Sequence, residues 1–318
     1  MSDLSVVVVS WNGWSLLCEC LDSLDREIRR TSTLGLQVIV VDNGSQDGTQ
    51  RELAARFPWA ECVALPVNRG FAAGANAGLR RASARHAALL NNDTVIPAGA
   101  LEACVAYLDA HPQVGVVGPQ LQGPDGRKQN SVHKEPGLLT EVVPHWLLEG
   151  LWPRRYPSKR RALAGPVAVD AVLGACLVVR GEILARVGLL SEDYFFFLEE
   201  TEWCRTIRRA GWEVRHLPGI AVTHVHGATS KKRDPARTRI EYHRSLYRFF
   251  RKNRGPAALA VLLAVRVLKS ALHVAVGAPA ALFSRKARDR WRARRRVLVW
   301  HLAGRPEGWG LAPVAGDG

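Results

Sequence analysis

Short apolar runs alternate with longer amphipathic stretches over roughly the first 230 residues of the chain. The runs are rich in Val, Ile and Leu, which is typical of buried strands in a parallel sheet. The expected strands are 4–10, 36–41, 61–65, 87–90, 114–117 and 169–179, with a last short strand and turn at 220–227. Helices are expected over 16–24, from about 50, from within 68–78, around 101–108 and over 199–209, with a helical turn at 182–187. Strands that alternate with helices predict βαβ units, and therefore an α/β fold with a mostly parallel sheet.

Polar residues stand where the expected strand 87–90 ends. Asn91, Asn92 and Asp93 follow it directly, ahead of Pro97. Ligands of open α/β sheets bind at the carboxyl ends of the strands, and amide and carboxylate oxygens suit Mg²⁺ or Mn²⁺ carrying a phosphate. A polar turn closed by Pro97 explains the same residues equally well.

Two other strand ends carry candidate ligand-binding segments. Asp42 ends the second strand and is the type of residue that binds a nucleotide base or ribose, although the segment 43–49 is also explained as a turn and a helix cap. The segment 68–78 is rich in Gly and Ala, which lets a backbone approach a ligand closely. It lacks the G-x-G-x-x-G spacing, so by itself it is a weak phosphate signal.

Acids and a histidine follow the later strands. Glu199, Glu200 and Glu202 stand at the start of an expected helix, where one or two acids would complement the helix dipole. A third acid after an aromatic run is more than a helix start needs, and crowding of like charges raises one pKa toward that of a general base. His224 lies at the end of the last strand, and a lone histidine there is more often structural.

The span 120–167 breaks the alternation. It contains Gly, Pro, aromatic residues and the cationic run 154–161. We interpret it as an excursion over the surface that contacts substrate, with a solvated charged face as the equally good alternative.

The C-terminal part changes character. Residues 256–283 are mostly apolar, but Arg266 and Lys269 interrupt them, so no uncharged run reaches the roughly 18–20 residues that span a bilayer. Eight cations follow within 285–296. The pattern favours helices that lie in the membrane interface with basic residues on lipid phosphates. A helical pair packed on the body of the protein, or a re-entrant hairpin that turns at 277–279, is the alternative.

Charge and cysteine usage sharpen this division. Residues 1–230 carry 23 Lys and Arg against 24 Asp and Glu, whereas residues 231–318 carry 21 against 5. Residues 1–230 are therefore nearly neutral, and we expect the basic residues 231–318 to bind phosphate groups, in anionic lipid or in nucleic acid. None of the six cysteines forms C-x-x-C or a zinc-type cluster, which indicates free thiols in a reducing compartment. The N-terminus shows no signal-peptide pattern, so we expect the body to stay cytosolic.

Taken together, the ordered motifs resemble those of family 2, GT-A fold, inverting glycosyltransferases of the rhamnosyltransferase type. The resemblance covers residues 4–230. The matching stretches are Val8-Val9-Ser10-Trp11-Asn12-Gly13, Val41-Asp42-Asn43-Gly44-Ser45-x-Asp47-Gly48-Thr49, Asn68-x-Gly70-Phe71-Ala72-Ala73-Gly74-x-Asn76-x-Gly78, Leu90-Asn91-Asn92-Asp93-Thr94, Gly174-Ala175-Cys176, Tyr194-Phe195-Phe196-x-x-Glu199-Glu200-x-Glu202-x-Cys204-x-x-x-Arg208 and His224-x-x-Gly227. Each motif is weak alone, and seven in order are strong evidence.

The resemblance implies a GT-A nucleotide-binding sheet flanked by helices, with a basic and apolar helical extension at the C-terminus. Trp11, Asn12 and Asp42 would hold the base and ribose of a nucleotide-sugar. Further donor-binding residues would be Ser10, Asn43, Gly70, Phe71, Asn76, Asn91 and Asn92. Deoxythymidine-diphosphate-rhamnose is the donor that the family suggests first, and a uridine-diphosphate sugar the second.

The resemblance also implies a metal site and a base. Asn91-Asn92-Asp93 would be this chain's form of the D-x-D element, with Asp93 and His224 as protein ligands of a divalent metal, Mg²⁺ or Mn²⁺. Glu200 falls where the family places its catalytic base, and Glu199 is the alternative. Asn91 stands where many relatives carry an acid, and Glu200 is one methylene longer than the common Asp.

We therefore expect an inverting glycosyltransferase domain over 1–240, with a donor half of about 1–118 and an acceptor half of about 119–240, followed by a membrane-associating tail over 241–318. The acceptor would be a lipid-linked or cell-envelope saccharide at the cytoplasmic face of the membrane, with residues 241–300 on anionic lipid; a homodimer is left open. Two other classes compete. One is a nucleic-acid-binding protein that uses the basic tail, although the body of the chain lacks a recognised reading module. The other is a nucleotidyltransferase, which would release pyrophosphate.

Overall fold

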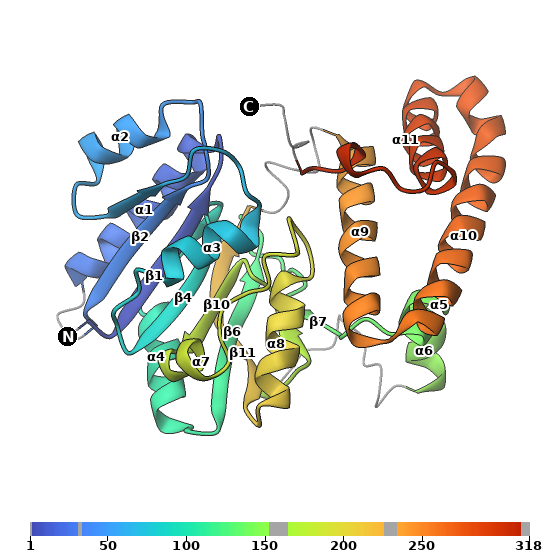
Figure 1. Cartoon of the computed structure of the whole chain (residues 1–318). Coiled ribbons are helices and arrows are strands. Elements are labelled where there is room, and N and C mark those ends of the chain that lie inside the picture. Colours follow the sequence, from blue (N-terminus) through green and yellow to red (C-terminus); the bar gives the residue numbers. More distant parts are fainter. Residues whose placement is uncertain (1, 31–33, 153–164, 226–233, 313–318) are drawn as a thin grey trace. The chain divides into compact units, whose positions relative to one another are not determined.

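The structure is a computed structural model that describes residues 2–30, 34–152, 165–225 and 234–312 (Figure 1). The cationic run 154–161 and Gly227 of the last motif lie outside the described residues. The chain divides into two compact units, and each unit is made of three separate segments of the sequence. Residues 1–135, 162–194 and 199–228 form the α/β unit, and residues 136–161, 195–198 and 229–318 form the helical unit.

A nine-stranded sheet forms the centre of the α/β unit, and its strand order is β3-β2-β1-β4-β10-β6-β11-β5, with β8 paired to β11. The strands are β1 (Leu4–Ser10), β2 (Leu36–Asp42), β3 (Glu61–Ala64), β4 (His86–Asn91), β5 (Thr94–Val95), β6 (Val114–Gln122), β8 (Val167–Ala168), β10 (Cys176–Arg180) and β11 (Glu213–His224). A separate pair joins β7 (Val132–His133) to β9 (Ala171–Val172). The first four strands in the order are parallel, β6 and β11 are parallel, and β10 runs antiparallel between β4 and β6.

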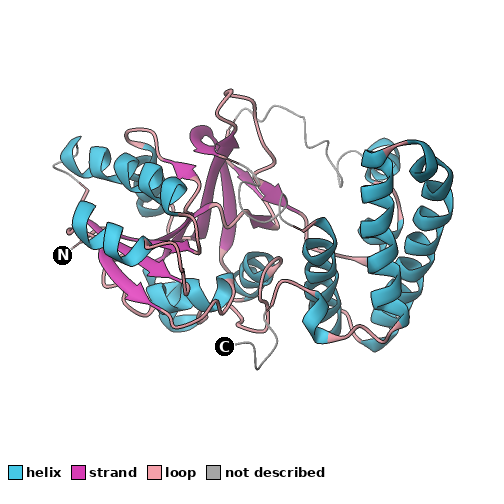
Figure 2. Ribbon diagram, turned by 90° about the horizontal axis from the view of Figure 1, so that it is seen from above, coloured by secondary structure: helices cyan, strands magenta, loops and turns pink. Residues whose placement is uncertain are grey.

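Helices cover both faces of this sheet (Figure 2). One face packs against α1 (Trp14–Arg30), α2 (Thr49–Arg56) and α4 (Ala100–Ala110), and the other against α3 (Phe71–Leu79), α7 (Gly181–Arg186) and α8 (Glu199–Arg209). In β1 the side chains alternate accordingly, with Val6 and Val8 in the first core and Val7 in the second. This period of two, with both faces apolar, is why the run reads as continuously hydrophobic.

The predicted mostly parallel α/β sheet is confirmed, and three strands differ clearly from the sequence prediction. Strand β6 continues to Gln122, beyond the expected end at 117. The expected strand 169–179 is two strands, β9 and β10, separated at Gly174. The last strand is much longer than expected, because β11 begins at Glu213 and continues through the Pro218-Gly219 interruption to His224. Its pairing with β6 shifts register between Leu217 and Ala221, so the interruption is absorbed as an irregularity within one strand.

The helical unit contains α5 (Leu138–Val142), α6 (His145–Leu151), α9 (Pro235–Asn253), α10 (Pro256–Phe283), α11 (Arg285–Leu302) and a short 3₁₀ turn, η1 (Glu307–Trp309). Asp234 caps α9 by accepting hydrogen bonds from the backbone N–H groups of Ala236 and Arg237. Helix α11 is held against α10 by Trp291, whose indole Nε1–H donates to the carbonyl of Val274 at 2.9 Å.

The alternative of a hairpin that turns at 277–279 is wrong, because α10 is one helix through these residues. The helix runs without a break through Gly277-Ala278-Pro279, and the chain turns instead at Ser284, whose hydroxyl accepts the N–H of Ala287. The two apolar runs that Arg266 separates in the sequence are therefore one element. By length and composition alone, α10 is long and apolar enough to cross a membrane, which is weak evidence for a span.

Candidate active site

The carboxyl ends of β1 and β2 hold a linked pair of loops. Asp42, buried at the end of β2, accepts hydrogen bonds from the Ser45 N–H at 3.1 Å and from Gln50 Nε2 at 2.5 Å. Asn12 has a left-handed backbone (φ 47°), accepts the Gln46 N–H at 2.7 Å through Oδ1, and donates its own N–H to Ser45 Oγ. Non-glycine residues in this conformation are uncommon and gather at functional sites.

Trp11 stands beside this loop pair with an exposed side chain, at 43% relative exposure. A large indole that is left open to solvent at the carboxyl edge of a parallel sheet offers a flat apolar face to a nucleotide base. The donor-binding role that the sequence predicts for Trp11 and Asp42 stays a prediction.

Two further donor-binding predictions, Asn43 and Asn76, fall on residues whose side-chain amides bond within the protein. Asn43 donates to Asn68 Oδ1 and to the carbonyl of Gly70. Asn76, buried on α3, donates to the carbonyl of Leu190 at 2.8 Å and accepts the Leu190 N–H at 3.0 Å. These amides hold the loop before α3 and the loop before α8 in place, which is a supporting role; direct contact with a donor stays a prediction.

The predicted metal ligands, far apart in the chain, meet at one point. Antiparallel pairing of β5 with β11 sets Thr94 opposite His224 and so brings Asp93 alongside. The Nε2 atom of His224 lies 3.3 Å from Asp93 Oδ1, and both side chains are buried. Asn92 turns the other way and donates to Ser10 Oγ at 3.0 Å. Within the described residues, no group of three or more His, Cys, Asp or Glu side chains gathers in a form that could hold a metal.

Gln129 fixes the orientation of His224, and sequence reasoning missed it. The Nε2 amide of Gln129 donates to the His224 carbonyl at 2.8 Å, which identifies the other amide atom as oxygen, and this oxygen lies 3.0 Å from His224 Nδ1. An amide oxygen only accepts, so Nδ1 carries the proton. In the neutral ring, Nε2 then presents its lone pair toward the Asp93 carboxylate. Two acceptors that face each other repel, and a cation bound between them would remove this repulsion. Asp93 and His224 therefore fit a divalent metal.

Glu200 has the environment of a general base. It lies in the first turn of α8 with 8% relative exposure, and burial raises its pKa from 4.5 to about 7, against the opposing effect of hydrogen bonds from the helix start. A carboxylate with a pKa near neutrality can take up a proton and release it again at working pH. Phe197 and Leu198, the two residues before α8, both have positive φ.

Gly174 lies between Glu200, the predicted base, and Phe71, a predicted donor-binding residue. A Cβ added at Gly174 would lie 3.6 Å from Phe71 Cε1 and 3.7 Å from Glu200 Cβ. Phe71, which opens α3, and the predicted base therefore converge on one glycine between β9 and β10. Glu199 is also buried in the first turn of α8.

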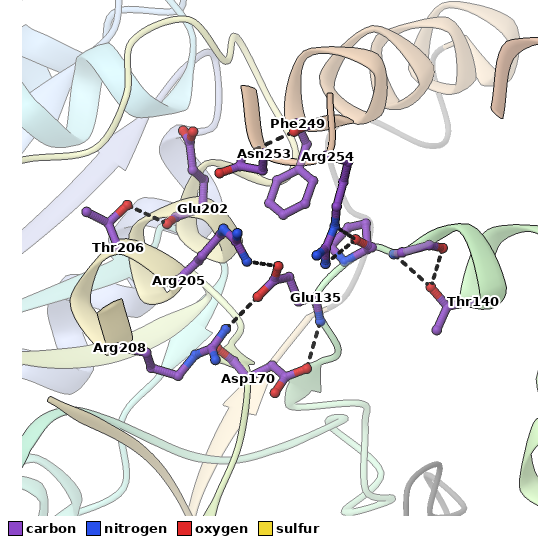
Figure 3. A network of polar contacts seen from close by, with 12 residues as sticks. Glu135, Thr140, Asp170, Glu202, Arg205, Thr206, Arg208, Phe249, Asn253 and Arg254 are labelled. Atoms are coloured by element: carbon purple, nitrogen blue, oxygen red, sulfur yellow. Dashed lines mark hydrogen bonds and ion pairs between the residues drawn. The ribbon is translucent and has the colours of Figure 1, made fainter. Parts of the chain in front are cut away.

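A partly buried ion network anchors α8 (Figure 3). The carboxylate of Glu135 pairs with Arg205 and Arg208 of α8, the Arg208 bond being 2.8 Å long. Asp170 accepts the Glu135 N–H at 3.1 Å, and its carbonyl accepts from Arg208 Nε at 2.9 Å. Nothing in the local pattern around Glu135 indicates this role, because the pairing joins residues from three distant parts of the chain.

Solved structures share the fold of this chain. The mannosyltransferase PcManGT from Pyrobaculum calidifontis, solved with GDP-mannose and Mn²⁺, superposes with a TM-score of 0.56 at 21% identity over 95% of this chain and 86% of its own. GalNAc-T7, solved with UDP, GalNAc and Mn²⁺, superposes with a TM-score of 0.57 at 14% identity over 78% of this chain and 48% of its own. At these identities the likeness shows the fold, which is the GT-A fold predicted from the sequence.

The sequence adds the family. The model described as "Glycosyl transferase family 2" matches residues 5–188, more than half of the chain, so the protein belongs to that family. The N-acetylglucosaminyl-diphospho-decaprenol L-rhamnosyltransferase of Mycobacterium tuberculosis is 29% identical over 261 residues, which are 77% of this chain and 83% of that enzyme. The protein is thus a glycosyltransferase resembling rhamnosyltransferases, as predicted. Membership of this family favours sugar transfer over the nucleic-acid-binding and nucleotidyltransferase hypotheses.

Proposed function

We propose that the protein transfers a sugar, rhamnose as the first candidate, from a nucleoside-diphosphate-sugar to a hydroxyl of a lipid-linked or cell-envelope saccharide, with inversion at the anomeric carbon. Family membership supports sugar transfer, and the mycobacterial relative, named as acting on a diphospho-decaprenol, supports the acceptor class. The observation that carries the mechanism is the buried Glu200, whose pKa of about 7 suits a base near neutrality.

In the proposed reaction Glu200 accepts the proton of the acceptor hydroxyl. The hydroxyl oxygen forms a bond to the anomeric carbon as the bond from that carbon to the diphosphate oxygen breaks, and the nucleoside diphosphate departs with the electron pair. Attack from the face opposite the leaving group inverts the configuration in one displacement. No covalent link to the protein is needed, and Trp11 and Asp42 would hold the base and ribose throughout.

A divalent metal, Mg²⁺ or Mn²⁺, would be held by Asp93 and His224. When bound it supplies Lewis-acid neutralisation of the charge that builds on the diphosphate. Because the chain offers two side chains here, diphosphate and water oxygens would complete the coordination. Asn91, at the position of the missing acid, would contact the donor. Mn²⁺ in two of the solved structural neighbours is consistent with this choice.

The proposed site of action is the cytoplasmic face of a membrane, where a lipid-linked acceptor is anchored. The test is a donor screen: purified protein with Mn²⁺ and a panel of nucleotide-sugars, assayed for nucleoside-diphosphate release with and without membrane lipid extract. Release from one donor, lost on addition of EDTA, is the expected result. Anomeric configuration of the product by NMR then reports inversion.

Variants separate the roles. Asp93→Ala and Glu200→Gln should each abolish transfer, and Asp93→Ala alone should also weaken Mn²⁺-dependent binding of the nucleoside diphosphate in calorimetry. Glu182→Gln, an exposed acid on α7, is the control that should keep both properties. Full activity in both Asp93→Ala and Glu200→Gln would contradict the mechanism, and release of pyrophosphate would contradict the reaction class.

A further inference from the structure

The four residues before α8 belong to the helical unit, although the chain on either side of them belongs to the α/β unit. The α/β unit includes the chain up to Tyr194 and again from Glu199, and the helical unit includes Phe195–Leu198 between them. We call residues 195–198 the lead segment. Glu200, the proposed base, is the second residue of α8 and stands two residues beyond this segment. Whatever holds the lead segment therefore acts on the start of the helix that carries the base.

The backbone of the lead segment has an uncommon conformation. Phe197 and Leu198 have φ angles of 76° and 69°, in the left-handed region that bulky residues rarely adopt. Leu198 also offers no side-chain acceptor to cap the helix that begins at Glu199. Two such residues in succession persist only where the surrounding structure holds them. The start of α8 is therefore fixed by contacts that the lead segment makes and not by its own sequence.

Helix α9 supplies two of these contacts. The hydroxyl of Ser245, a buried residue, donates a hydrogen bond to the Phe196 carbonyl at 2.7 Å. The ring of Tyr242 meets the ring of Phe197 edge to face, with the ring centroids 5.8 Å apart. Tyr242 and Ser245 are three residues apart and lie on one face of α9. This face therefore holds two successive residues of the lead segment.

Another face of α9 is fixed to α11. The Tyr247 hydroxyl lies 2.7 Å from Nε2 of His301, and Nδ1 of the same ring lies 2.8 Å from the Val297 carbonyl. Because a carbonyl only accepts, Nδ1 carries the proton and Nε2 accepts from Tyr247. Burial lowers the pKa of His301, which keeps the ring neutral and this pairing intact. The Tyr247 ring also stacks on Trp300. The face of α9 that holds the lead segment is therefore backed by a packed helix.

We propose that Tyr242 and Ser245 are positioning residues for Glu200, because they hold the lead segment and so fix the first turn of α8. Helix ends fray unless they are held, and Glu200 lies in that turn. Fraying would move Glu200 from its place beside Gly174, where its Cβ lies 3.7 Å from the position of a Cβ added to the glycine. This inference rests on the proposed function and deepens it, since it gives a helix of the C-terminal part a role in the reaction.

The first experiment measures nucleoside-diphosphate release by the full chain carrying Ser245→Ala, with the donor that the screen selects and membrane lipid extract. We expect kcat to fall about tenfold to a hundredfold, while KM for the donor and the affinity for its nucleoside diphosphate stay the same. The pH limb of the rate should move from about 7 toward 4.5, because a frayed turn lets water reach the carboxylate. Tyr242→Ala should cause the same losses, and Tyr242→Phe, which keeps the ring, should restore the rate.

The second experiment needs neither donor nor acceptor. Hydrogen exchange followed by mass spectrometry should show faster exchange of the amides of residues 195–202 in Ser245→Ala. The same amides should be unaffected in Ser270→Ala, a matched change at a buried serine of α10. The pH-dependent stability that Glu200→Gln gains over the parent protein should also shrink in the Ser245→Ala background, because a carboxylate reached by water gains less from neutralisation.

The two experiments separate this inference from the proposed function. Wild-type protein that transfers no sugar would contradict the proposed function, and exchange and stability would still decide whether α9 holds the start of α8. Three results would overturn the inference. They are exchange at 195–202 that is indifferent to Ser245→Ala, faster exchange with kcat and the pH profile unchanged, and equal effects of Ser245→Ala and Ser270→Ala, as general damage to the helical unit would produce.

Discussion

Replacement of Glu200 by Gln tests the chemistry and the energetics of the site together. Burial holds the folded-state pKa of Glu200 at about 7, above its ordinary 4.5, so the folded protein binds this proton more tightly than the unfolded chain does. The group therefore contributes stability that is full below about pH 4.5 and is lost as the pH rises through 7. The difference between the folded-state pKa and the ordinary pKa corresponds to about 3 kcal/mol of unfolding free energy, which is lost once the pH is well above 7.

Glu200→Gln removes this titration, because an amide of the same shape carries no charge to bury. We expect the variant to be inactive and yet more stable than wild type at about pH 8, by up to about 3 kcal/mol in urea unfolding, with the advantage vanishing near about pH 4. The wild-type rate of nucleoside-diphosphate release should rise with pH through about 7 and fall to roughly a tenth of its plateau at about pH 6.

The pH profile and the Glu199→Gln variant decide whether Glu200 is the base. A rate limb near pH 4.5, or a difference in unfolding free energy between variant and wild type that does not change with pH, would refute the assigned environment of Glu200. Loss of activity in Glu199→Gln, with activity retained in Glu200→Gln, would move the base to Glu199. Glu182→Gln, which changes an exposed carboxylate on α7, should show neither effect.

Three further outcomes follow from the site and the core. Gln129→Leu should weaken Mn²⁺ binding about tenfold to a hundredfold in electron paramagnetic resonance titrations with nucleoside diphosphate present, because His224 loses the partner that fixes its tautomer; unchanged affinity would remove Gln129 from the site. Trp11→Ala should weaken nucleoside-diphosphate binding by calorimetry several-fold while the urea midpoint stays the same, since the indole is exposed; an unchanged affinity would place the base elsewhere. Gly78→Ala should cost about 1–3 kcal/mol of stability in urea, because the added methyl collides with Val7 where α3 packs closely on β1; a neutral result would show that the core relaxes there.

The amino-acid sequence by itself was sufficient for the class of fold and for the edge of the sheet where the candidate site lies. Apolar runs such as 4–10 are buried on both faces of a sheet, and their composition alone reports this. Parallel strands end at a common edge, so the polar residues Asp42 and Asn91–Asp93 were predictable at one edge of the sheet. The order of the motifs gave the family, which the profile match over residues 5–188 confirms.

Tertiary packing decided what no local pattern encodes. The contact between Asp93 and His224 exists because β5 pairs with β11, and the tautomer of His224 depends on Gln129, which belongs to no motif. The pKa of Glu200 follows from desolvation, a property of everything packed around the carboxylate and not of the residues beside it in the chain. Arg266 interrupts the apolar sequence of the tail, but α10 continues through it, and the Arg266 guanidinium pairs with Glu141 of α5. Each of these depends on atoms brought together from distant segments, and only the folded chain fixes those distances.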